Sequence, residues 1–370
     1  MSVATLLSAK LAWFLDIFSK PQRRHFLAYI MGLMLIVRFR SVRRISGEFS
    51  RADQSALNHF LTDASWEGRE LVGRSQALVR ERIGGRAVQF VIDDTADERK
   101  GKCIEGVGVH HCGNGLVRGH CLVAASVFAG GEMYLWDFRG YVPKGGCKRG
   151  EFKSKVELAV DMIRNADMGD APAVLALWDA WYTCEDVAKA ARGRGWHYLG
   201  AVRKNRIIFI GRERHRARDL AKGRRCYDRV KCGSHSFRAA RVEGWLGGLG
   251  EAAVFIVKSE RLGTRFLVTS DMTMSAAEAV RTYARRFWIE TQFREAKQLF
   301  GLGELFLRKW RGVQKHWALV MTAYNVAQML KRFPKLSKLK TTGAVLRALQ
   351  GEFRTKDVKL FMSEILSKAA

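Results

Sequence analysis

Acidic residues are scarce in this 370-residue chain. Asp and Glu number 36 against 64 Lys and Arg, which leaves a formal net charge of +28 at pH 7. A charge excess of that size repels itself unless a polyanion binds to it. The composition therefore predicts a polyanionic partner. The two candidates are nucleic acid, whose phosphates release counterions when they are neutralised, and an anionic membrane surface.

Long apolar runs are also lacking. The best candidate, residues 28–37, spans ten residues and ends at Arg38. A membrane-spanning helix needs about 20 apolar residues, so a buried helix explains this run better. Residues 1–20 carry apolar side chains at a helical period with charged residues between them, a pattern typical of an amphipathic helix and not of a secretory signal peptide. We therefore expect no membrane partner, and nucleic acid becomes the preferred polyanion.

Paired cysteines are missing as well. The seven cysteines are odd in number and form no Cys-x-x-Cys pair, which argues against a disulfide framework and against a zinc ribbon. His110-His111-Cys112 and the group of Cys226, Cys232 and His235 contain metal-ligand types, but neither has the paired spacing of a structural zinc site. The cysteine usage therefore predicts a protein of the reducing cytoplasm. With nucleic acid as the preferred polyanion, the chain would be associated with the nucleoid when it is bound to DNA.

The first 85 residues have a helical pattern throughout. Hydrophobic residues make up 48% of the chain, enough for one large domain or two to three smaller ones. Helices predicted at 39–48 and 52–62 would meet at a tight turn with basic side chains exposed, namely Arg40, Arg43, Arg44 and Arg51. Two interpretations remain open: a helix-turn-helix that docks on DNA, or an ordinary helical bundle with a basic surface. We assign 1–85 to a helical DNA-binding domain in which Arg43 and Arg44 contact DNA.

After Gly84 and Gly85 the pattern changes to strands. Residues 87–92 form an apolar run that ends at Asp93, and 173–178 form another that ends at Asp179. The remaining predicted elements are a hairpin of 120–128 with 132–139, a helix at 151–165, a helix at 184–194 capped by Thr183, and a strand at 196–202. This order predicts an α/β protein with a ribonuclease-H-like mixed sheet. Strands that end in acids would place those acids at one edge of the sheet.

Residues 274–300 are predicted to form one long helix. Ser275 and Glu278 have the spacing of a capping box at its start, and Gly301 can end it. Tyr283, Glu290 and Lys297 follow one another at seven-residue intervals and therefore share a face, with Arg286 and Arg294 beside Glu290. Such a face is often only a solvated row of ion pairs. Here Glu290 lies within an apolar segment, residues 287–293, so its carboxylate would need a cation or a metal.

The spacing Tyr-x2-Arg-x3-Glu-x6-Lys at Tyr283, Arg286, Glu290 and Lys297 resembles the signature around the last catalytic acid of bacterial cut-and-paste transposases. The similarity is to the insertion-sequence family numbered four and its close relatives. Two further segments match: Asp93-Asp94-Thr95 resembles the D-x-T after the first strand, and Asp179 to Tyr182 resembles the D-x-x-Y after the fourth. A lone Asp at a strand end is more often a turn former. The three motifs together are what favour the resemblance.

The resemblance implies a catalytic set of Asp93, Asp179 and Glu290 that holds two Mg²⁺ ions, for which Mn²⁺ would substitute. Two such ions activate a water or a 3′-hydroxyl and stabilise the leaving oxygen. Asp94 stays open as the alternate to Asp93. The D-x-T spacing favours Asp93, and strand alternation would turn Asp94 to the other side. The DNA-binding residues implied on the helix are Tyr283, Arg286, Arg294 and Lys297.

Between Asp179 and Glu290 lie 110 residues, more than a single strand and a turn require. In the family a mostly β insertion occupies this interval, and strand character is present at 225–232, 236–243, 252–258 and 265–270. Residues 203–238 hold 13 Lys and Arg against three acids, which would clamp DNA phosphates unless the segment is only a solvated basic loop. The predicted domains are 86–203 and 274–333 for the catalytic core, 204–273 for the basic insertion, and 334–370 for a helical C-terminal tail.

These observations predict a DNA transposase that cuts an insertion sequence at its terminal inverted repeats and joins it to double-stranded target DNA. We expect a homodimer assembled on the DNA. Two alternatives remain: a stand-alone metal-dependent nuclease of the same fold, and a non-catalytic DNA-binding protein descended from a transposase. The presence of all three acids argues against the second alternative.

Overall fold

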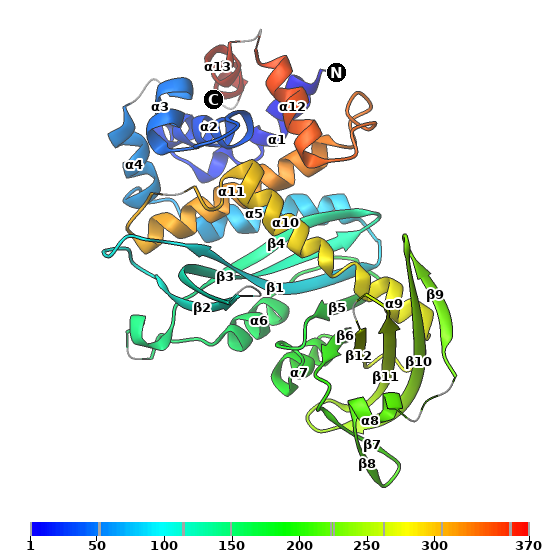
Figure 1. Ribbon diagram of the computed structural model, residues 1–370. Helices are drawn as coiled ribbons and strands as arrows, with labels where there is room; N and C mark the ends of the chain where they lie inside the picture. Colours follow the sequence, from blue (N-terminus) through cyan, green and yellow to red (C-terminus); the bar gives the residue numbers. More distant parts are fainter. Residues whose placement is uncertain are drawn as a thin grey trace.

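The structure is a computed structural model that describes residues 2–50, 53–112, 115–148, 150–222, 224, 226–261, 263–304, 306–354 and 357–368. It has three parts, which Figure 1 shows from top to bottom: a layer of helices that contains both termini, a central mixed sheet, and a second group of strands from the middle of the chain. Two helices, α6 (Lys155–Arg164) and α7 (Glu185–Gly193), lie on the face of the central sheet opposite the helical layer.

The central sheet is built around β1 (Val88–Glu98). β1 pairs antiparallel with β3 (Gly115–Ala129) on one side and parallel with β5 (Val174–Trp178) on the other. The sheet is completed by β2 (Gly108–Cys112) and β4 (Glu132–Tyr141), which pair with β3, and by β6 (His197–Val202), which pairs parallel with β5. This mixed sheet with helices on both faces confirms the predicted ribonuclease-H-like α/β fold.

β1 runs further than its apolar pattern predicts, so the expectation that the strand ends at Asp93 is wrong. Its parallel pairing with β5 stops at Val91, but its antiparallel pairing with β3 continues residue by residue from Gln89 to Glu98. Asp93 and Asp94 therefore lie inside the strand, at the point where β5 no longer covers one of its edges. The short strand β2 was also not expected.

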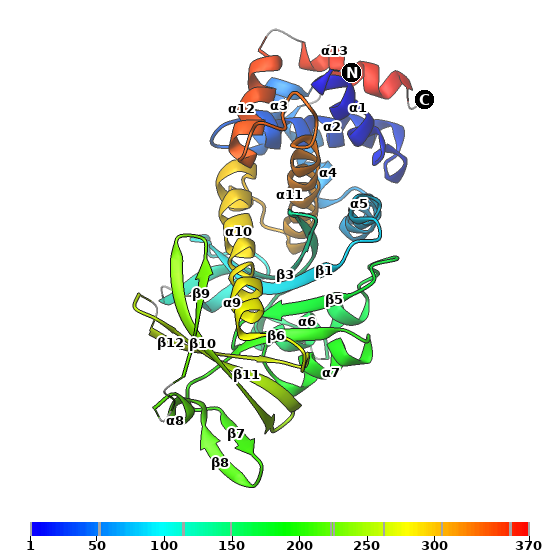
Figure 2. The same cartoon turned by 90° about the vertical axis from the view of Figure 1, so that its right-hand side faces the viewer.

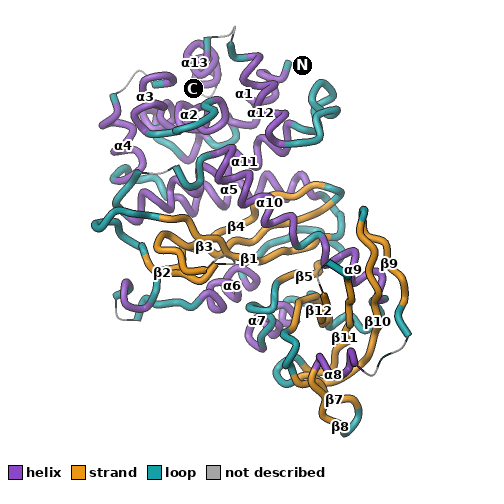
Figure 3. The backbone as a smooth tube through the Cα atoms, in the orientation of Figure 1, coloured by secondary structure: helices purple, strands orange, loops and turns teal. Residues whose placement is uncertain are grey.

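The predicted insertion contains six strands and a short helix. Four of the six strands were expected. They are β7 (Ile207–Ile210), β8 (Glu213–Arg216), α8 (Ala217–Lys222), β9 (Asp228–Cys232), β10 (His235–Leu246), β11 (Gly250–Ser259) and β12 (Gly263–Thr269). β12 pairs antiparallel with β6, so these strands extend the central sheet into one continuous sheet (Figure 3). The β7–β8 hairpin and α8 lie in the basic stretch 203–238, for which a solvated loop was the alternative interpretation. Arg225, the predicted start of one strand, is outside the described residues.

The helical layer contains elements from both ends of the chain. They are α1 (Val3–Ala12), a 3₁₀ turn (Leu15–Ile17), α2 (Lys20–Leu35), α3 (Val42–Phe49), α4 (Gln54–Thr62), α5 (Gly68–Ile83), α11 (Trp310–Leu330), α12 (Thr342–Glu352) and α13 (Val358–Lys368). α11 is almost wholly buried, with helices from residues 1–85 packed around it and β4 against it. The helical pattern predicted for both ends is confirmed, although α1 ends earlier than expected. The predicted helix starts Met1 and Ala52 and the predicted end Ala369 are outside the described residues.

The apolar run at 28–37 belongs mostly to α2, whose residues from Phe26 to Met34 are buried. This agrees with the expected buried helix. Among the described residues, no helix has the length and apolar character needed to cross a membrane.

The long helix expected at 274–300 is interrupted, and this expectation is corrected. α9 (Ala276–Ala284) and α10 (Phe287–Phe300) lie nearly in line (Figure 2). At the junction, backbone bonds span three residues in place of four: the N–H of Arg285 bonds to Thr282, and the N–H of Arg286 to Tyr283. Such 3₁₀ bonding tightens the helix locally. Ser275 caps α9 as expected, and Gly301 ends α10 at a φ of 70°.

Arg40 was expected to be exposed, but it is only 4% exposed. Its guanidinium donates to the carbonyls of Leu33, Val37 and Leu299, and it forms an ion pair of 3.1 Å with Glu304. Arg43 and Arg44 are exposed as expected, and Arg51 is outside the described residues. A buried guanidinium needs acceptors of this kind to offset its lost hydration.

His316 joins three helices at the centre of the layer. Its Nδ1 lies 2.8 Å from the hydroxyl of Tyr29 on α2, and its Nε2 lies 3.0 Å from the carbonyl oxygen of Gly301 after α10. Burial lowers the pKa of His316 to about 4. The ring is therefore neutral in the folded protein, with Tyr29 donating to Nδ1 and Nε2 donating to Gly301.

We expect folding stability to fall by about 2 kcal/mol from His316 alone when the pH drops from 7 to 5. The unfolded chain takes up a proton at His316 near pH 6.5, but the folded protein resists protonation until about pH 4, so the stabilising contribution is complete above pH 6.5 and is lost as the pH falls toward 4. Denaturant unfolding at both pH values measures it. A His316→Gln variant with an unreduced pH dependence would contradict the assignment.

Candidate active site

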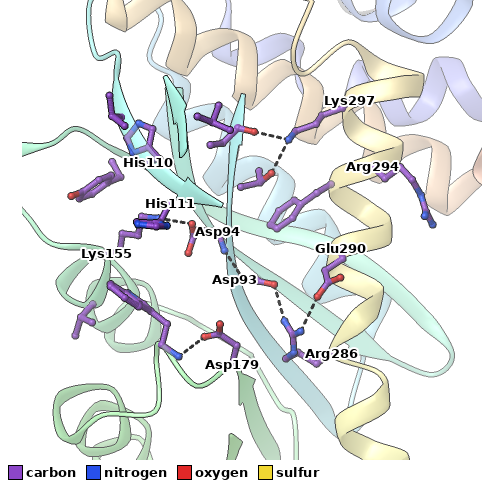
Figure 4. A pocket seen from close by; sticks show the side chains of 18 of the residues that line it. Asp93, Asp94, His110, His111, Lys155, Asp179, Arg286, Glu290, Arg294 and Lys297 are labelled. Carbon is purple, nitrogen blue, oxygen red and sulfur yellow. Dashed lines mark hydrogen bonds and ion pairs between the residues drawn. The ribbon is translucent and has the colours of Figure 1, made fainter. Parts of the chain in front are cut away.

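A groove with a volume of about 1000 Å³ brings together acidic side chains from three separate elements. Asp93 and Asp94 come from β1, Asp179 follows β5, and Glu290 comes from α10 (Figure 4). The parallel pairing of β1 with β5 aligns Val91 with Leu177, so Asp93 and Asp179 each lie two residues beyond the last paired position, and α10 passes beside them. The fold thus gathers residues that lie up to 197 positions apart in the sequence.

Asp93 and Asp94 turn to opposite sides of β1 because side chains alternate along a strand. Asp93 faces α10, where one carboxylate oxygen accepts a hydrogen bond of 2.8 Å from Arg286. Asp94 faces α6: it accepts hydrogen bonds of 2.6 Å from Lys155 and 2.9 Å from the hydroxyl of Tyr182. The two adjacent carboxylates therefore have different partners.

Arg286 lies between two of the acids. Its guanidinium forms ion pairs of 2.8 Å with Asp93 and 2.7 Å with Glu290, and only 9% of its side chain is exposed. Burial raises the pKa of Asp93 to about 7; the charge of Arg286 opposes this rise, and that of Asp179 adds to it. Asp179 lines the same groove as Asp93 and Glu290, so all three acids surround one site.

Asp179 begins the turn after β5. One oxygen of its carboxylate accepts hydrogen bonds from the backbone N–H groups of Trp181, at 2.8 Å, and Tyr182, at 3.3 Å. The hydroxyl of Thr183 donates to the carbonyl of Asp179, and Cys184 occupies the N-cap of α7, so Thr183 is not the cap that was expected. The turn fixes the Asp179 side chain at the mouth of the groove, where Trp181 is 56% exposed.

Some of the side chains predicted to bind DNA from α9 and α10 already contact other residues of the protein. Lys297 lines the groove but donates to Thr95 Oγ1, at 2.9 Å, and to the carbonyl of Ala96, at 2.7 Å, which fastens α10 to β1. Arg294 is exposed on the groove wall. Tyr283 stands on α9 below Arg286, and burial raises its pKa to about 12. Arg43 and Arg44 lie in the helical layer and do not line the groove.

Comparison with known proteins places this site in a family. A family model described as DDE superfamily endonuclease matches residues 13–242. The chain belongs to the DDE superfamily endonucleases. The match includes Asp93, Asp94 and Asp179 but ends before Arg286 and Glu290, whose assignment depends on the motif and on the geometry of the groove.

One relative is a probable transposase for insertion sequence element IS701 from Microchaete diplosiphon. It is 24% identical over 211 residues, which cover 55% of this chain and 55% of that protein. The chain thus matches about half the length of this relative. Neither the family match nor this relative gives specific support to the insertion-sequence family numbered four.

The members of this superfamily generally use divalent metal ions, and the donor set of the groove suits them. Carboxylate oxygens are the ligands that hard divalent cations prefer. In the part of the chain that the structure describes, no three His, Cys, Asp or Glu side chains are grouped closely enough to hold an ion as they stand. Arg286 stands between Asp93 and Glu290, so it would have to leave this position for both acids to ligate.

Sequence reasoning missed several residues of this DDE endonuclease site. Lys155 was within a predicted helix but was not singled out, and Tyr182 was noted only as part of a motif. His110 and His111 were noted, with Cys112, only as metal-ligand types without the spacing of a zinc site. The structure places both histidines in the groove wall, where His110 Nε2 lies 3.0 Å from the carbonyl of Gly119. The Tyr of the D-x-x-Y motif was a usable signal for Tyr182. For Lys155 no local signal exists, because its role depends on contact between α6 and β1.

Proposed function

We propose that this chain is a DNA transposase that cuts an insertion sequence from DNA at its ends and joins the 3′ ends to a target. One observation carries the proposal: Asp93, Asp179 and Glu290, from three distant segments, line one groove in a chain of net charge +28. The Tyr283 to Lys297 motif supports the closer assignment to relatives of the insertion-sequence family numbered four.

Asp93, Asp179 and Glu290 are the residues that would hold two Mg²⁺ ions, with Mn²⁺ as a substitute. When bound, such ions lower the pKa of a ligated water or 3′-hydroxyl and stabilise the leaving oxygen. Asp93 is preferred to Asp94 because it faces Asp179 and α10, whereas Asp94 faces α6 and accepts hydrogen bonds from Lys155 and Tyr182. Asp94 thereby acts as a structural anchor between β1, α6 and the Asp179 turn.

The chain's own cations would position the DNA. Arg286 would exchange its ion pairs with Asp93 and Glu290 for a DNA phosphate as the acids take up the metal ions. Arg294 is exposed on the same wall and would contact the neighbouring phosphate, while Lys297 and Tyr283 hold the wall in place and complete the phosphate site. Such positioning brings the scissile phosphorus into line with the attacking oxygen.

The reaction would consist of two displacements at phosphorus. Water first attacks at the element end, which breaks the bond to the 3′ oxygen and leaves a free 3′-hydroxyl. That hydroxyl then attacks a phosphodiester of the target, and the 3′ oxygen of the target leaves. The helices of 1–85, with Arg43 and Arg44, and the basic insertion at 204–273 would hold the duplex outside the groove. The active assembly would be a homodimer on nucleoid DNA in the cytoplasm.

The proposal is tested with a DNA fragment that carries short inverted repeats found beside the coding sequence. With Mg²⁺ or Mn²⁺, we expect breaks at the repeat ends and joining of those ends to a plasmid, both detected on sequencing gels. Asp179→Asn is the negative control, because it keeps the side-chain volume and the hydrogen bonds of its turn.

The alternatives have different outcomes. Cleavage that ignores the repeats and yields no joined product would identify a stand-alone nuclease. Binding without cleavage in either metal would identify a non-catalytic DNA-binding protein. Either result would overturn the transposase proposal.

A further inference from the structure

The loop between α2 and α3 holds apolar side chains out in solvent. Val37 is 63% exposed and Phe39 is 74% exposed, although both neighbouring positions in the chain, Ile36 and Arg40, are buried. Phe39 is also the only residue other than glycine with a positive φ, 56°, in the part of the chain that the structure describes. A bulky residue rarely adopts this backbone conformation, because its side chain makes it strained.

Arg40 fixes the loop in this shape. Its guanidinium donates to the carbonyls of Val37, at 3.0 Å, and Leu33, at 3.2 Å, and its backbone N–H donates to Glu304, at 2.7 Å. These bonds secure the chain on either side of Phe39. The aromatic ring is therefore presented outward by a rigid base, which lowers the entropy cost of inserting it into a partner.

The charges around the loop favour DNA as that partner. Arg38, next to Phe39 in the chain, and Arg43, in the first turn of α3, are exposed. Arg44, also exposed, donates to the carbonyl of Arg38 and forms an ion pair of 2.6 Å with Glu48. An apolar tip flanked by arginines matches proteins that push an aromatic side chain between base pairs from the minor groove while cations hold the phosphates.

The loop is also aligned with the groove. Glu290, Arg294, Lys297 and Gly301 recur at intervals of four, three and four residues, so they form one stripe along α10. Arg40 lies at the end of this stripe: it donates to the carbonyl of Leu299 at 2.7 Å, and a methyl group on Gly301 would come within 3.0 Å of its side chain. From Glu290 to Leu299 the helix rises about 14 Å, close to four base-pair steps of B-DNA at 3.4 Å each.

We propose that Phe39 is a DNA wedge that unstacks one base step about four to six pairs from the scissile phosphate. The proposal rests on the proposed function for its substrate, a duplex whose end occupies the groove. Insertion fixes the register of the duplex, because a ring held between two bases stops the DNA from sliding past the metal site. Phe39 is thus a positioning residue for the reaction.

The test uses the full-length protein and duplexes carrying the fluorescent base 2-aminopurine at successive positions from the cleavage site. Wild-type protein should raise the fluorescence at one position, since unstacking relieves quenching. Phe39→Ala and Phe39→Gly should lose that signal and bind about 5- to 50-fold more weakly, as base–aromatic contacts are worth about 1–3 kcal/mol before the cost of unstacking. The salt dependence of binding should stay unchanged, because no charge is removed.

Two controls separate the wedge from damage to the fold. Phe39→Gly should not lower the melting temperature, because glycine adopts a φ of 56° without strain. Leu360→Ala removes an apolar side chain of α13 that is 59% exposed and should leave both DNA readouts unchanged. Phe39→Trp should retain the fluorescence signal.

Wild-type fluorescence that stays flat at every position, or Phe39 variants that bind and unstack DNA like wild type, would overturn the proposal. Unchanged DNA binding with loss of self-association in sedimentation would overturn it too, and would assign the loop to contact with a second copy of the chain. The results can contradict the two proposals separately. A Phe39-dependent fluorescence signal without any DNA cleavage would support the wedge and contradict the proposed transposase function.

Discussion

Replacing Glu290 by Gln is expected to slow strand cleavage by about 100- to 1000-fold. The substitution keeps the volume of the side chain but removes a negative ligand from the metal site, and metal-centred charge stabilisation is worth several kcal/mol at about 1.36 kcal/mol per tenfold in rate. DNA affinity should be nearly unchanged, because the substitution keeps the side-chain volume and leaves Arg286 and Arg294, the cations proposed to contact DNA, in place. Single-turnover cleavage at saturating DNA, with affinity measured separately, gives both numbers.

Glu278→Gln is the matched control. Glu278 lies in the first turn of α9, where it is exposed and outside the groove, and its backbone N–H, which Ser275 caps, is unaffected by the substitution. It should cleave like the unsubstituted protein. Full cleavage by Glu290→Gln would show that Glu290 is not in the catalytic set. It would favour the alternative interpretation, in which the cationic face of α10 is only a surface row of ion pairs.

The second large effect distinguishes the two adjacent aspartates. Asp93→Asn should abolish cleavage, since Asp93 faces Asp179 and Arg286 and would lose its capacity as a metal ligand. Asp94→Asn should keep cleavage but lower the free energy of unfolding by about 1–3 kcal/mol, because it weakens charge-assisted bonds to a partly buried partner. That partner is Lys155, whose side chain is 14% exposed. Cleavage assays and denaturant unfolding, run on both variants, separate the two effects.

Tyr182→Phe tests the structural part of this argument independently. It removes the 2.9 Å hydrogen bond to Asp94 without altering any charge in the groove. We expect lower stability with cleavage retained. If Asp94→Asn alone stops cleavage, the metal ligand is Asp94 and the choice of Asp93 is wrong.

The sequence predicted the order of strands and helices well because most of it is local. Apolar runs and helical periods marked β1, β5, β6, α6 and α7, and the family motif added the insertion. The extent of β1 beyond Ile92 was not predictable in this way, because its last residues are extended by pairing with β3 and not by an apolar pattern of their own. The interruption between α9 and α10 occurs at Arg285 and Arg286, where neither Gly nor Pro gives a signal.

For the candidate site, motifs selected Asp93, Asp179 and Glu290, and the structure places all three around one groove. Their roles as ligands remain predictions. What the sequence could not show is which cations face which acids. Lys297 on α10 was expected to bind DNA, and the structure adds a contact with the backbone of β1 that was not predicted. Arg40 was expected on the surface, but it is buried against Glu304. Both outcomes depend on contacts between segments more than 200 residues apart, which no local pattern encodes.

The pairing of β6 with β12 determines where insertions and deletions can be accommodated as the sequence evolves. The chain leaves the central sheet at Val202 and returns at Phe266, and these two residues are register partners on adjacent strands. Exit and entry are therefore neighbours, whatever the length of chain between them. Within that interval β9, β10 and β11 pack against α9, so they are tied to the helices of the site. The β7–β8 hairpin is the part whose length can change while the spacing of the three acids is kept.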